Sequence, residues 1–155
     1  MRKDRMIEEY IHDPYFVKSK YEEPSVCEVC GVVFDDGIFK WEDPPKDAKK
    51  MICPACRRIQ DKYYGGFVEL SGGYLQSHKE EILNLIRNEE EKEKNLRPLE
   101  RIAKIQEEDG KIVIYTTYEH IARRIGEAVH KAHKGSLELH YTEGAHFLRV
   151  KWHRD

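Results

Sequence analysis

Long hydrophobic runs are absent from this sequence of 155 residues, which nowhere approaches the roughly 18 consecutive apolar residues of a membrane-spanning helix. The opening residues 1–4, Met-Arg-Lys-Asp, lead into no hydrophobic signal region. With 39% hydrophobic and 36% charged residues, the core must be modest. The sequence therefore predicts a cytoplasmic protein without a membrane partner.

A large net charge of one sign is also missing. The formal net charge of −2 argues against strong non-specific attraction to nucleic acid or to a membrane surface. The charge is nevertheless uneven along the chain, because residues 46–64 carry six Lys and Arg against two Asp, whereas residues 79–109 carry ten acids against seven bases. The sequence predicts a local basic patch rather than a basic protein.

Motifs of nucleotide hydrolysis and of nucleophilic catalysis do not occur. The glycine pairs at residues 65–66 and 72–73 lack the Gly-Lys-Ser/Thr of a P-loop. No Ser/His/Asp or Cys/His arrangement stands out. Six of the eight histidines follow residue 111, but their spacing forms no recognised set of metal ligands. We therefore predict that the protein is not an enzyme and takes no small-molecule substrate.

Cysteine is scarce, and its four copies are confined to residues 27–56. They form two Cys-x-x-Cys pairs with 22 residues between them, whereas a disulfide framework normally spreads its cysteines across a secreted chain. Two residues between paired cysteines let one tight turn aim both sulfurs at one metal ion, and Gly31 suits such a turn. An iron–sulfur cluster and a redox-active dithiol are the alternatives. The sequence predicts one structural zinc ion, bound by Cys27, Cys30, Cys53 and Cys56.

Prolines, glycines and apolar spacing divide the chain into three segments. Residues 1–23 are predicted to be a charged, aromatic arm, with a short helix near residues 4–11 and an extended chain after it; a disordered tail is the alternative. Residues 24–66 are the predicted zinc ribbon, and the glycine pair at its end relaxes the chain. Residues 67–155 are the predicted α+β domain.

Hydrophobic periodicity predicts the elements of the α+β domain. In chain order these are a strand at 67–70, a helix at 74–95, strands at 99–107 and 111–117, a helix at 118–134, and strands at 136–142 and 145–152. Thr116 and Glu119 fit a capping box for the second helix. The apolar stripe of this helix runs through Ile121, Ile125, Ala128, Val129 and Ala132. The first six elements match a ferredoxin-like (split βαβ) antiparallel sheet with two helices, to which the seventh adds an edge strand.

Cations and tyrosines surround the second Cys-x-x-Cys pair. This set consists of Lys49, Lys50, Arg57, Arg58, Lys62, Tyr63 and Tyr64. Cations that pair with phosphate and rings that stack on bases are what single-stranded or looped RNA requires. Arg123, Arg124 and Lys131 lie off the apolar stripe of the helix at 118–134 and form a second candidate phosphate-binding face. An ordinary basic surface and a solvated helix face are the alternatives.

Two stretches of the chain resemble a known family. Residues 53–60 (CPACRRIQ) and 63–70 (YYGGFVEL) are similar to the end of the zinc region of the large-ribosomal-subunit nuclear export adaptor of eukaryotes and its archaeal relatives. Residues 114–125 are similar to a strand and helix of that family. The whole chain, including residues 12–15 and 23–31, resembles short bacterial proteins distantly related to those adaptors.

The resemblance implies binding to a ribosomal subunit or its rRNA. It does not imply nuclear export, because this chain has two Cys-x-x-Cys pairs where the adaptors have more and lacks their long C-terminal regions. The sequence as a whole predicts a non-enzymatic zinc protein that binds RNA or the ribosome, in subunit maturation or in ribosome protection (hibernation) during slow growth. The alternatives are a zinc-ribbon adaptor for protein interaction or transcription, and a redox or metal-sensing dithiol protein.

Overall fold

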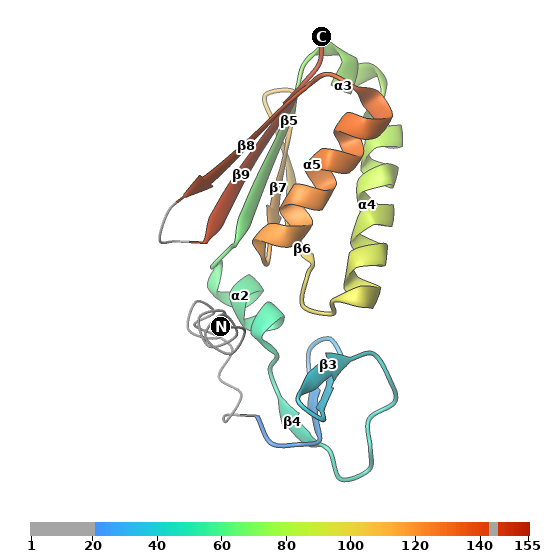
Figure 1. The fold of residues 1–155 in the computed structure, drawn as a ribbon, viewed down its shortest axis with the longest axis vertical. Helices are drawn as coiled ribbons and strands as arrows, with labels where there is room; N and C mark the ends of the chain where they lie inside the picture. The colour runs from blue at the N-terminus through green and yellow to red at the C-terminus, as the bar shows by residue number, and fades with distance from the viewer. Residues whose placement is uncertain (1–20, 143–145) are drawn as a thin grey trace, which may run out of the picture. The chain divides into compact units, whose positions relative to one another are not determined.

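The computed structural model describes residues 21–142 and 146–155, in two compact units (Figure 1). The first unit ends at Asp61 and the second begins at Lys62, whereas the sequence predicts a boundary after Gly66. The helix predicted at 4–11 and most of the arm predicted at 1–23 lie outside the described residues. Within the described residues, no helix combines the length and apolar character needed to cross a bilayer.

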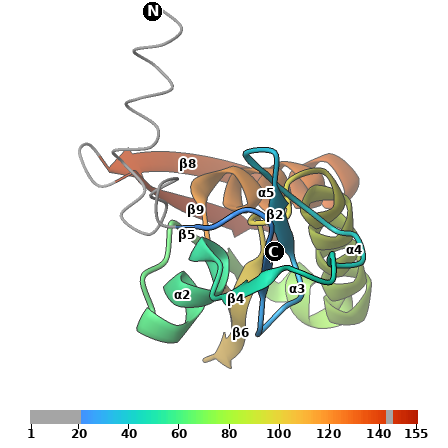
Figure 2. The same cartoon turned by 90° about the horizontal axis from the view of Figure 1, so that it is seen from below.

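The first unit is a small sheet followed by one helix. Its elements are β1 (Ser25–Cys27), β2 (Val33–Asp35), β3 (Ile38–Lys40), β4 (Lys49–Met51) and α2 (Pro54–Asp61). The strand order is β3-β2-β1-β4, in which β1 pairs antiparallel with β2 and parallel with β4. Figure 2 shows β2 and β4 of this sheet and the helix α2 that follows β4. Each of these strands has only three residues, so their hydrogen bonds alone give the unit little stability.

The core of the first unit is correspondingly small. Val32, Val33 and Phe34 are fully buried, and the ring of Phe34 packs against Phe39 and Tyr21 with centroids 4.7 and 5.8 Å away. A chain of about 40 residues is near the lower size limit for folding without a metal or a disulfide. So few buried apolar side chains do not offset the conformational entropy that such a chain loses when it becomes ordered. A further cross-link is needed, and the four cysteines of this unit are placed to supply it.

The second unit is a five-stranded sheet with helices on one face. Its elements are β5 (Gly66–Ser71), α3 (Gly73–Ser77), α4 (Lys79–Leu96), β6 (Ile102–Glu108), β7 (Lys111–Thr116), α5 (Glu119–His133), β8 (Ser136–Thr142) and β9 (Phe147–His153). The single helix predicted at 74–95 is interrupted at His78, whose φ of −125° separates α3 from α4. Figure 1 shows α4 and α5 side by side over the same face of the sheet.

The strand order of this sheet differs from the predicted ferredoxin-like order. β7 lies between β5 and β6 and is antiparallel to both, as in a split βαβ unit. The place on the other side of β5 belongs to β9, which is parallel to β5, and β8 forms the edge. The prediction that the seventh element adds an edge strand to an antiparallel sheet was therefore wrong.

Side-chain burial explains why β9 lies inside the sheet. Leu148, Val150 and Trp152 of β9 are all fully buried, whereas every residue of β8 is exposed or half-buried. The strand that brings large apolar side chains to the core gains most from a central position. β8 pairs only with β9 in this sheet and is therefore its edge strand.

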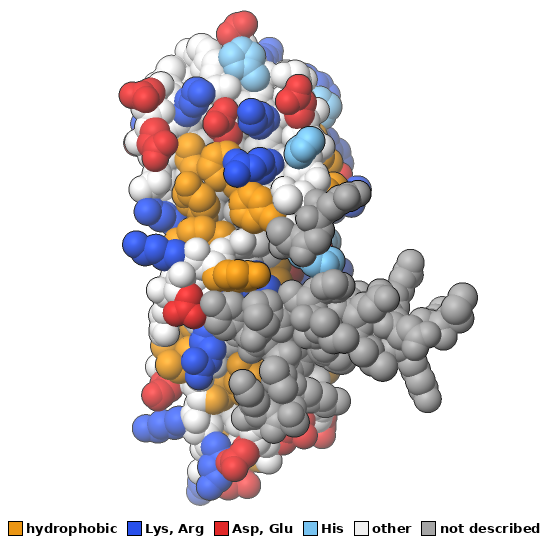
Figure 3. Space-filling model, turned by 90° about the vertical axis from the view of Figure 1, so that its left-hand side faces the viewer, with side chains coloured by type: hydrophobic (Ala, Val, Ile, Leu, Met, Phe, Trp, Pro, Cys, Tyr) orange, Lys and Arg blue, Asp and Glu red, His pale blue; other side chains and the backbone are white. Residues whose placement is uncertain are grey.

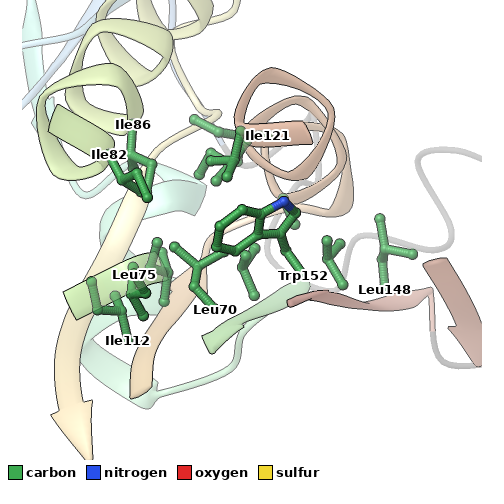
Figure 4. Close-up of a cluster of buried hydrophobic side chains, with 14 residues drawn as sticks. Leu70, Leu75, Ile82, Ile86, Ile112, Ile121, Leu148 and Trp152 are labelled. Carbon is green, nitrogen blue, oxygen red and sulfur yellow. The ribbon is translucent and has the colours of Figure 1, made fainter. Parts of the chain in front are cut away.

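The core of the second unit lies between the sheet and its helices (Figure 4). The largest fully buried side chains in this cluster are Leu70, Leu75, Ile82, Ile86, Ile112, Ile114, Ile121, Ile125, Leu148 and Trp152. The stripe predicted for α5 is confirmed at Ile121, Ile125 and Val129, which all point into this core. Of its other two members, Ala128 is half-buried and Ala132 is exposed. Trp152 also donates a hydrogen bond from Nε1 to the carbonyl of Lys134, which satisfies its one polar atom.

Gly65 and Gly66 do not relax the chain, contrary to the prediction. Gly65 N donates to Thr116 O at 3.0 Å, and Gly65 O accepts from Leu148 N at 3.1 Å, so Gly65 already joins the sheet. A Cβ atom on Gly66 would overlap Thr116 Oγ1 and the Cβ atom of Ala122. Both glycines are buried, and they allow the start of β5 to approach α5 closely.

The capping box predicted for α5 is also not formed. The N-cap residue is Tyr118, without a side-chain cap, and Thr116 Oγ1 donates to the carbonyl of Tyr118 instead. A carboxylate from a distant part of the chain replaces the cap, because Ile121 N donates to Glu100 Oε1 at 3.0 Å. A sequence window of four residues does not contain this long-range partner.

Burial raises the pKa of Glu100 to about 7, although the hydrogen bond from Ile121 N opposes this rise. Among the facing charges, Glu93 and Glu119 raise the pKa further and Arg97 lowers it. An unfolded chain loses this proton near pH 4.5, whereas the folded chain keeps it until about pH 7. Between these values the unfolded state binds fewer protons, so the free energy of unfolding falls as the pH rises.

The variant Glu100→Gln is expected to remove this pH dependence, because an amide does not ionise but still accepts the hydrogen bond from Ile121 N. Relative to wild type, the variant should gain roughly 1–3 kcal/mol of stability between pH 5 and pH 8. Urea unfolding followed by Trp152 fluorescence in a Trp41→Phe background measures this difference. Glu81, whose carboxylate is exposed, provides the control variant Glu81→Gln. Parallel pH profiles of stability for wild type and Glu100→Gln would contradict the raised pKa of Glu100 as the cause of the pH dependence.

Candidate functional site

The first Cys-x-x-Cys pair lies on a tight turn between β1 and β2. Cys27 is the last residue of β1, its N–H donates to Val32 O at 2.8 Å, and its carbonyl accepts from Gly31 N at 2.9 Å. Gly31 has a φ of 85°, a value that glycine adopts without strain. The turn predicted from the sequence is therefore formed, with Cys30 inside it.

The second pair lies where β4 passes into α2. Cys53 precedes the helix and Cys56 belongs to its first turn, and Cys56 N donates to Cys53 Sγ at 3.4 Å. The parallel pairing of β1 with β4 places Cys27 opposite Met51, two residues before Cys53. Cys53 N consequently donates to Cys27 Sγ at 3.3 Å, so the backbone of one pair holds a sulfur of the other.

The four sulfur atoms form one cluster. They all lie within 4.8 Å of one another, and Cys30 Sγ and Cys53 Sγ are 3.8 Å apart. Four thiolates at about 2.3 Å from a tetrahedral ion are separated by about 3.8 Å, so this spacing fits a metal ion and none of the four is in a disulfide. Within residues 21–142 and 146–155, no other group of three or more His, Cys, Asp or Glu side chains is arranged for a metal.

Full ionisation of the four thiols in this cluster would require a cation. Hydrogen bonds from Cys30, Cys53 and Cys56 lower the pKa of Cys27, whereas its neighbours Cys27 and Cys30 raise the pKa of Cys56. Four buried or half-buried sulfurs this close together cannot all be ionised without a compensating positive charge. A divalent metal ion would supply that charge, and four thiolate ligands would leave no position for water or substrate.

The predicted RNA-binding residues of the first unit are not equivalent. Lys49 and Lys50 on β4 and Arg57 on α2 are exposed. Arg58 is only 5% exposed, so the prediction that it contacts RNA conflicts with its burial. The reason is helical geometry, because Arg58 follows the buried residues Pro54 and Ala55 at offsets of four and three on the same face of α2.

The two tyrosines that follow α2 differ in their exposure to solvent. Tyr63 is 45% exposed and Lys62 is exposed, as a nucleic-acid contact would require. Tyr64 is half-buried, and its ring lies 4.8 Å from that of Tyr115 on β7. The structure therefore assigns Tyr64 to the sheet of the second unit.

The basic residues predicted on α5 are partly engaged in ion pairs. Arg123 Nε lies 3.3 Å from Glu127 Oε2, and Arg124 Nε lies 3.2 Å from Glu93 Oε1. Lys131 is exposed. Of the three predicted cations on this helix, two are thus partly neutralised by neighbouring carboxylates, which weakens the case for a phosphate-binding face.

Glu93 is the centre of a charged cluster between α4 and α5. Its buried carboxylate lies 3.2 Å from Arg97 Nη1 and 3.2 Å from Arg124 Nε. His120 Nε2 is 2.9 Å from Glu93 Oε2, which is an ion pair when the imidazole is protonated but not a well-aligned hydrogen bond. A buried carboxylate needs such partners, so Arg124 has a structural role.

The face of the sheet that points away from α4 and α5 carries rings and cations that the predicted site omits. Phe67 lies opposite Tyr115 on β7 and opposite Arg149 on β9, and the rings of Phe67 and Tyr115 have centroids 5.4 Å apart. The guanidinium of Arg149 lies 5.4 Å from the centroids of both Phe67 and Phe147. The sequence signal that could have indicated this face is the alternation of apolar and charged residues along 148–152. In the structure the apolar residues of this segment are buried and the charged ones are exposed.

No family model, curated protein or solved structure matches this chain.

Proposed function

We propose that this protein is a zinc-stabilised RNA-binding protein that acts on the ribosome, in subunit maturation or in protection of ribosomes during slow growth. The supporting observation is a closed four-thiolate site whose flanking elements carry exposed cations, Lys49 and Lys50 on β4 and Arg57 on α2. A metal without an open position stabilises a surface and does not react with a substrate. Cations on that surface suit a ligand with a phosphate backbone.

Zinc is the ion that we propose for this site. Tetrahedral sites of four thiolates are typical of zinc and of iron–sulfur proteins. Zinc favours the structural role, because it has no redox chemistry and is the usual ion of small units with two Cys-x-x-Cys turns. The site of this protein joins two such turns, each made by a short segment next to a strand of three residues.

The ribosome is the proposed target because of the resemblance to the export adaptors. In the structure, residues 53–60 form the second cysteine turn and most of α2, and residues 63–70 lead into β5. Residues 114–125 contain the end of β7 and the first half of α5. The resembling stretches thus include the second of the two cysteine pairs, most of β5 and the end of β7.

Sedimentation of a lysate through a sucrose gradient tests this function. We expect the protein to comigrate with a ribosomal subunit or the 70S particle and to leave that fraction after RNase treatment or at raised salt. The double variant Lys49→Gln/Lys50→Gln should weaken binding to purified rRNA about tenfold. The slope of log affinity against log salt concentration should become shallower by the equivalent of up to about two phosphate contacts.

Arg87→Gln/Lys92→Gln is the matched control, because it removes the same charge from exposed positions on the acidic helix α4. This control should leave rRNA affinity unchanged. A protein that stays at the top of the gradient in growing and in stationary cells would contradict the ribosomal function and favour the adaptor for protein interaction.

A further inference from the structure

Among the helices described for residues 62–155, none covers the face of the sheet that points away from α4 and α5. Alternation along β5 turns Val68 and Leu70 toward α4 and α5, and it turns Phe67 and Glu69 the other way. We call the side that carries Phe67 the open face. Figure 3 shows hydrophobic side chains with Lys and Arg beside them on this side of the second unit.

One row of the open face crosses all five strands. The strand register places these residues opposite one another in the order Lys104, Tyr115, Phe67, Arg149 and His140. Neighbouring strands lie about 4.8 Å apart, so the row is about 19 Å long. Two rings stand at its centre, a cation stands on each side of them, and the row contains no carboxylate.

Further rings extend the centre of this row. The ring of Tyr64 lies 4.8 Å from that of Tyr115 at an interplanar angle of 36°, and the guanidinium of Arg149 lies over both Phe147 and Phe67. All four rings are half-buried, so each leaves part of its surface exposed. Planar groups that support one another at these distances form a firm platform for a further planar group, such as a base.

The cations of the open face keep their charge available. Within the described part of the chain, none of Lys104, Arg149 and Lys151 forms an ion pair with a carboxylate, whereas Glu69 in the next row has Lys111 at 3.7 Å. A shallow hollow over β8 and β9 is lined by Glu138, His140, Arg149 and Lys151. Three of these four side chains can carry positive charge, as a pocket for a phosphate group requires.

From this geometry we propose that the open face binds single-stranded RNA, with bases stacked on Phe67 and Tyr115 and phosphates paired with Arg149 and Lys104. This inference takes RNA as the ligand from the proposed function and assigns to it a site that the predicted basic residues do not include. Rings on the central strands of an open sheet are how one common RNA-binding module stacks two or three bases. A duplex does not fit this surface, because its bases are already stacked inside it.

Fluorescence anisotropy with a labelled, uridine-rich single-stranded RNA of about twelve nucleotides tests the inference on the full-length, metal-loaded chain. Loss of one stacking ring typically weakens binding of single strands by about tenfold or more. We expect this loss for Phe67→Leu and for Tyr115→Leu, because leucine keeps the apolar contact but removes the ring. Affinity for the same RNA annealed into a duplex should not change.

Tyr141→Leu is the matched control, since Tyr141 is an exposed tyrosine of the same sheet that lies opposite the buried Leu148 and therefore on the helix side. It should bind the single strand as wild type does. If a ring variant has a lowered melting temperature, Arg149→Gln decides in its place, because Arg149 is exposed and outside the core. Its affinity should fall several-fold, and ultraviolet crosslinks to uridine should map to β5 or β7.

Two results would overturn the inference, and they separate it from the proposed function. If the ring variants and Arg149→Gln bind single strands as wild type does while Lys49→Gln/Lys50→Gln binds weakly, the RNA-binding function stands and the open face is not its site. If the wild-type chain binds no RNA and does not sediment with ribosomes, both proposals fail.

Discussion

Removal of the metal ion is expected to unfold residues 21–61 and to leave the sheet of residues 62–155 folded. The first unit has strands of three residues and few fully buried side chains. We therefore expect a metal ion shared by its two cysteine turns to provide most of its stability. Structural zinc contributes on the order of 10 kcal/mol to the folding of such small units. The second unit has a continuous core of its own, and none of its residues belongs to the cysteine cluster.

The two tryptophans allow the units to be observed separately. Trp41 belongs to the first unit, and Trp152 is fully buried in the second. After treatment with a strong chelator, the amide signals of residues 21–61 should collapse toward random-coil positions, while Trp152 fluorescence in a Trp41→Phe background should stay unchanged. Metal analysis should give one zinc per chain.

Cys53→Ser is expected to reproduce the effect of the chelator, because a hydroxyl is a poor ligand for zinc and Cys53 is fully buried between the two turns. Addition of zinc should refold the chelated wild type but not this variant. Retention of the first unit's amide signals without metal would show that the metal is not structural, and the redox alternative would then be tested by thiol titration.

The cysteine cluster could be predicted because its signal is local. Each Cys-x-x-Cys pair is made by one turn, and Gly31 marks the first of them with its φ of 85°. Two pairs on one short chain segment leave few arrangements other than a shared ion. Most strands and helices of residues 67–155 could be predicted for the same reason, since their periodicity lies within each element.

The strand order and the open face depend on contacts between elements far apart in the sequence. β8 and β9 both alternate, and only the packing of Leu148, Val150 and Trp152 against the helices decides which of them is central. Phe67 and Arg149 are 82 positions apart and meet only because β5 pairs with β9. A charge pattern read along the chain therefore selected cations near the cysteines and omitted this row.

Burial of Arg58 shows a third limit of such a prediction. Arg57 and Arg58 are adjacent cations of the same type, but successive residues of a helix point about 100° apart. Arg57 is exposed and Arg58 is buried with Pro54 and Ala55. For a helix of eight residues, the phase of its buried face follows from the tertiary packing, so composition alone does not distinguish the two.

The adjacent glycines Gly72 and Gly73 are expected to respond very differently to alanine. Gly72 links β5 to α3 with a φ of 108°, and a Cβ atom there would overlap the carbonyl oxygen of Arg154. That carbonyl is fixed, because it accepts a hydrogen bond from Tyr74 N while Arg154 N donates to Ser71 O. An overlap with backbone cannot be relieved by a change of rotamer.

Gly72→Ala should therefore destabilise the second unit by about 3 kcal/mol or more, since it combines backbone strain with overpacking. Gly73→Ala is the matched control, because Gly73 is exposed, begins α3, and would place its Cβ atom 3.9 Å from the nearest atom, in Asp155. Alanine is the better helix former, so this control should leave stability unchanged or raise it by up to about 1 kcal/mol. Urea unfolding followed by Trp152 fluorescence measures both variants. Equal stability of the two would mean that the last residues of the chain do not pack against the start of α3, and the place of β9 beside β5 would then lose one of its supports.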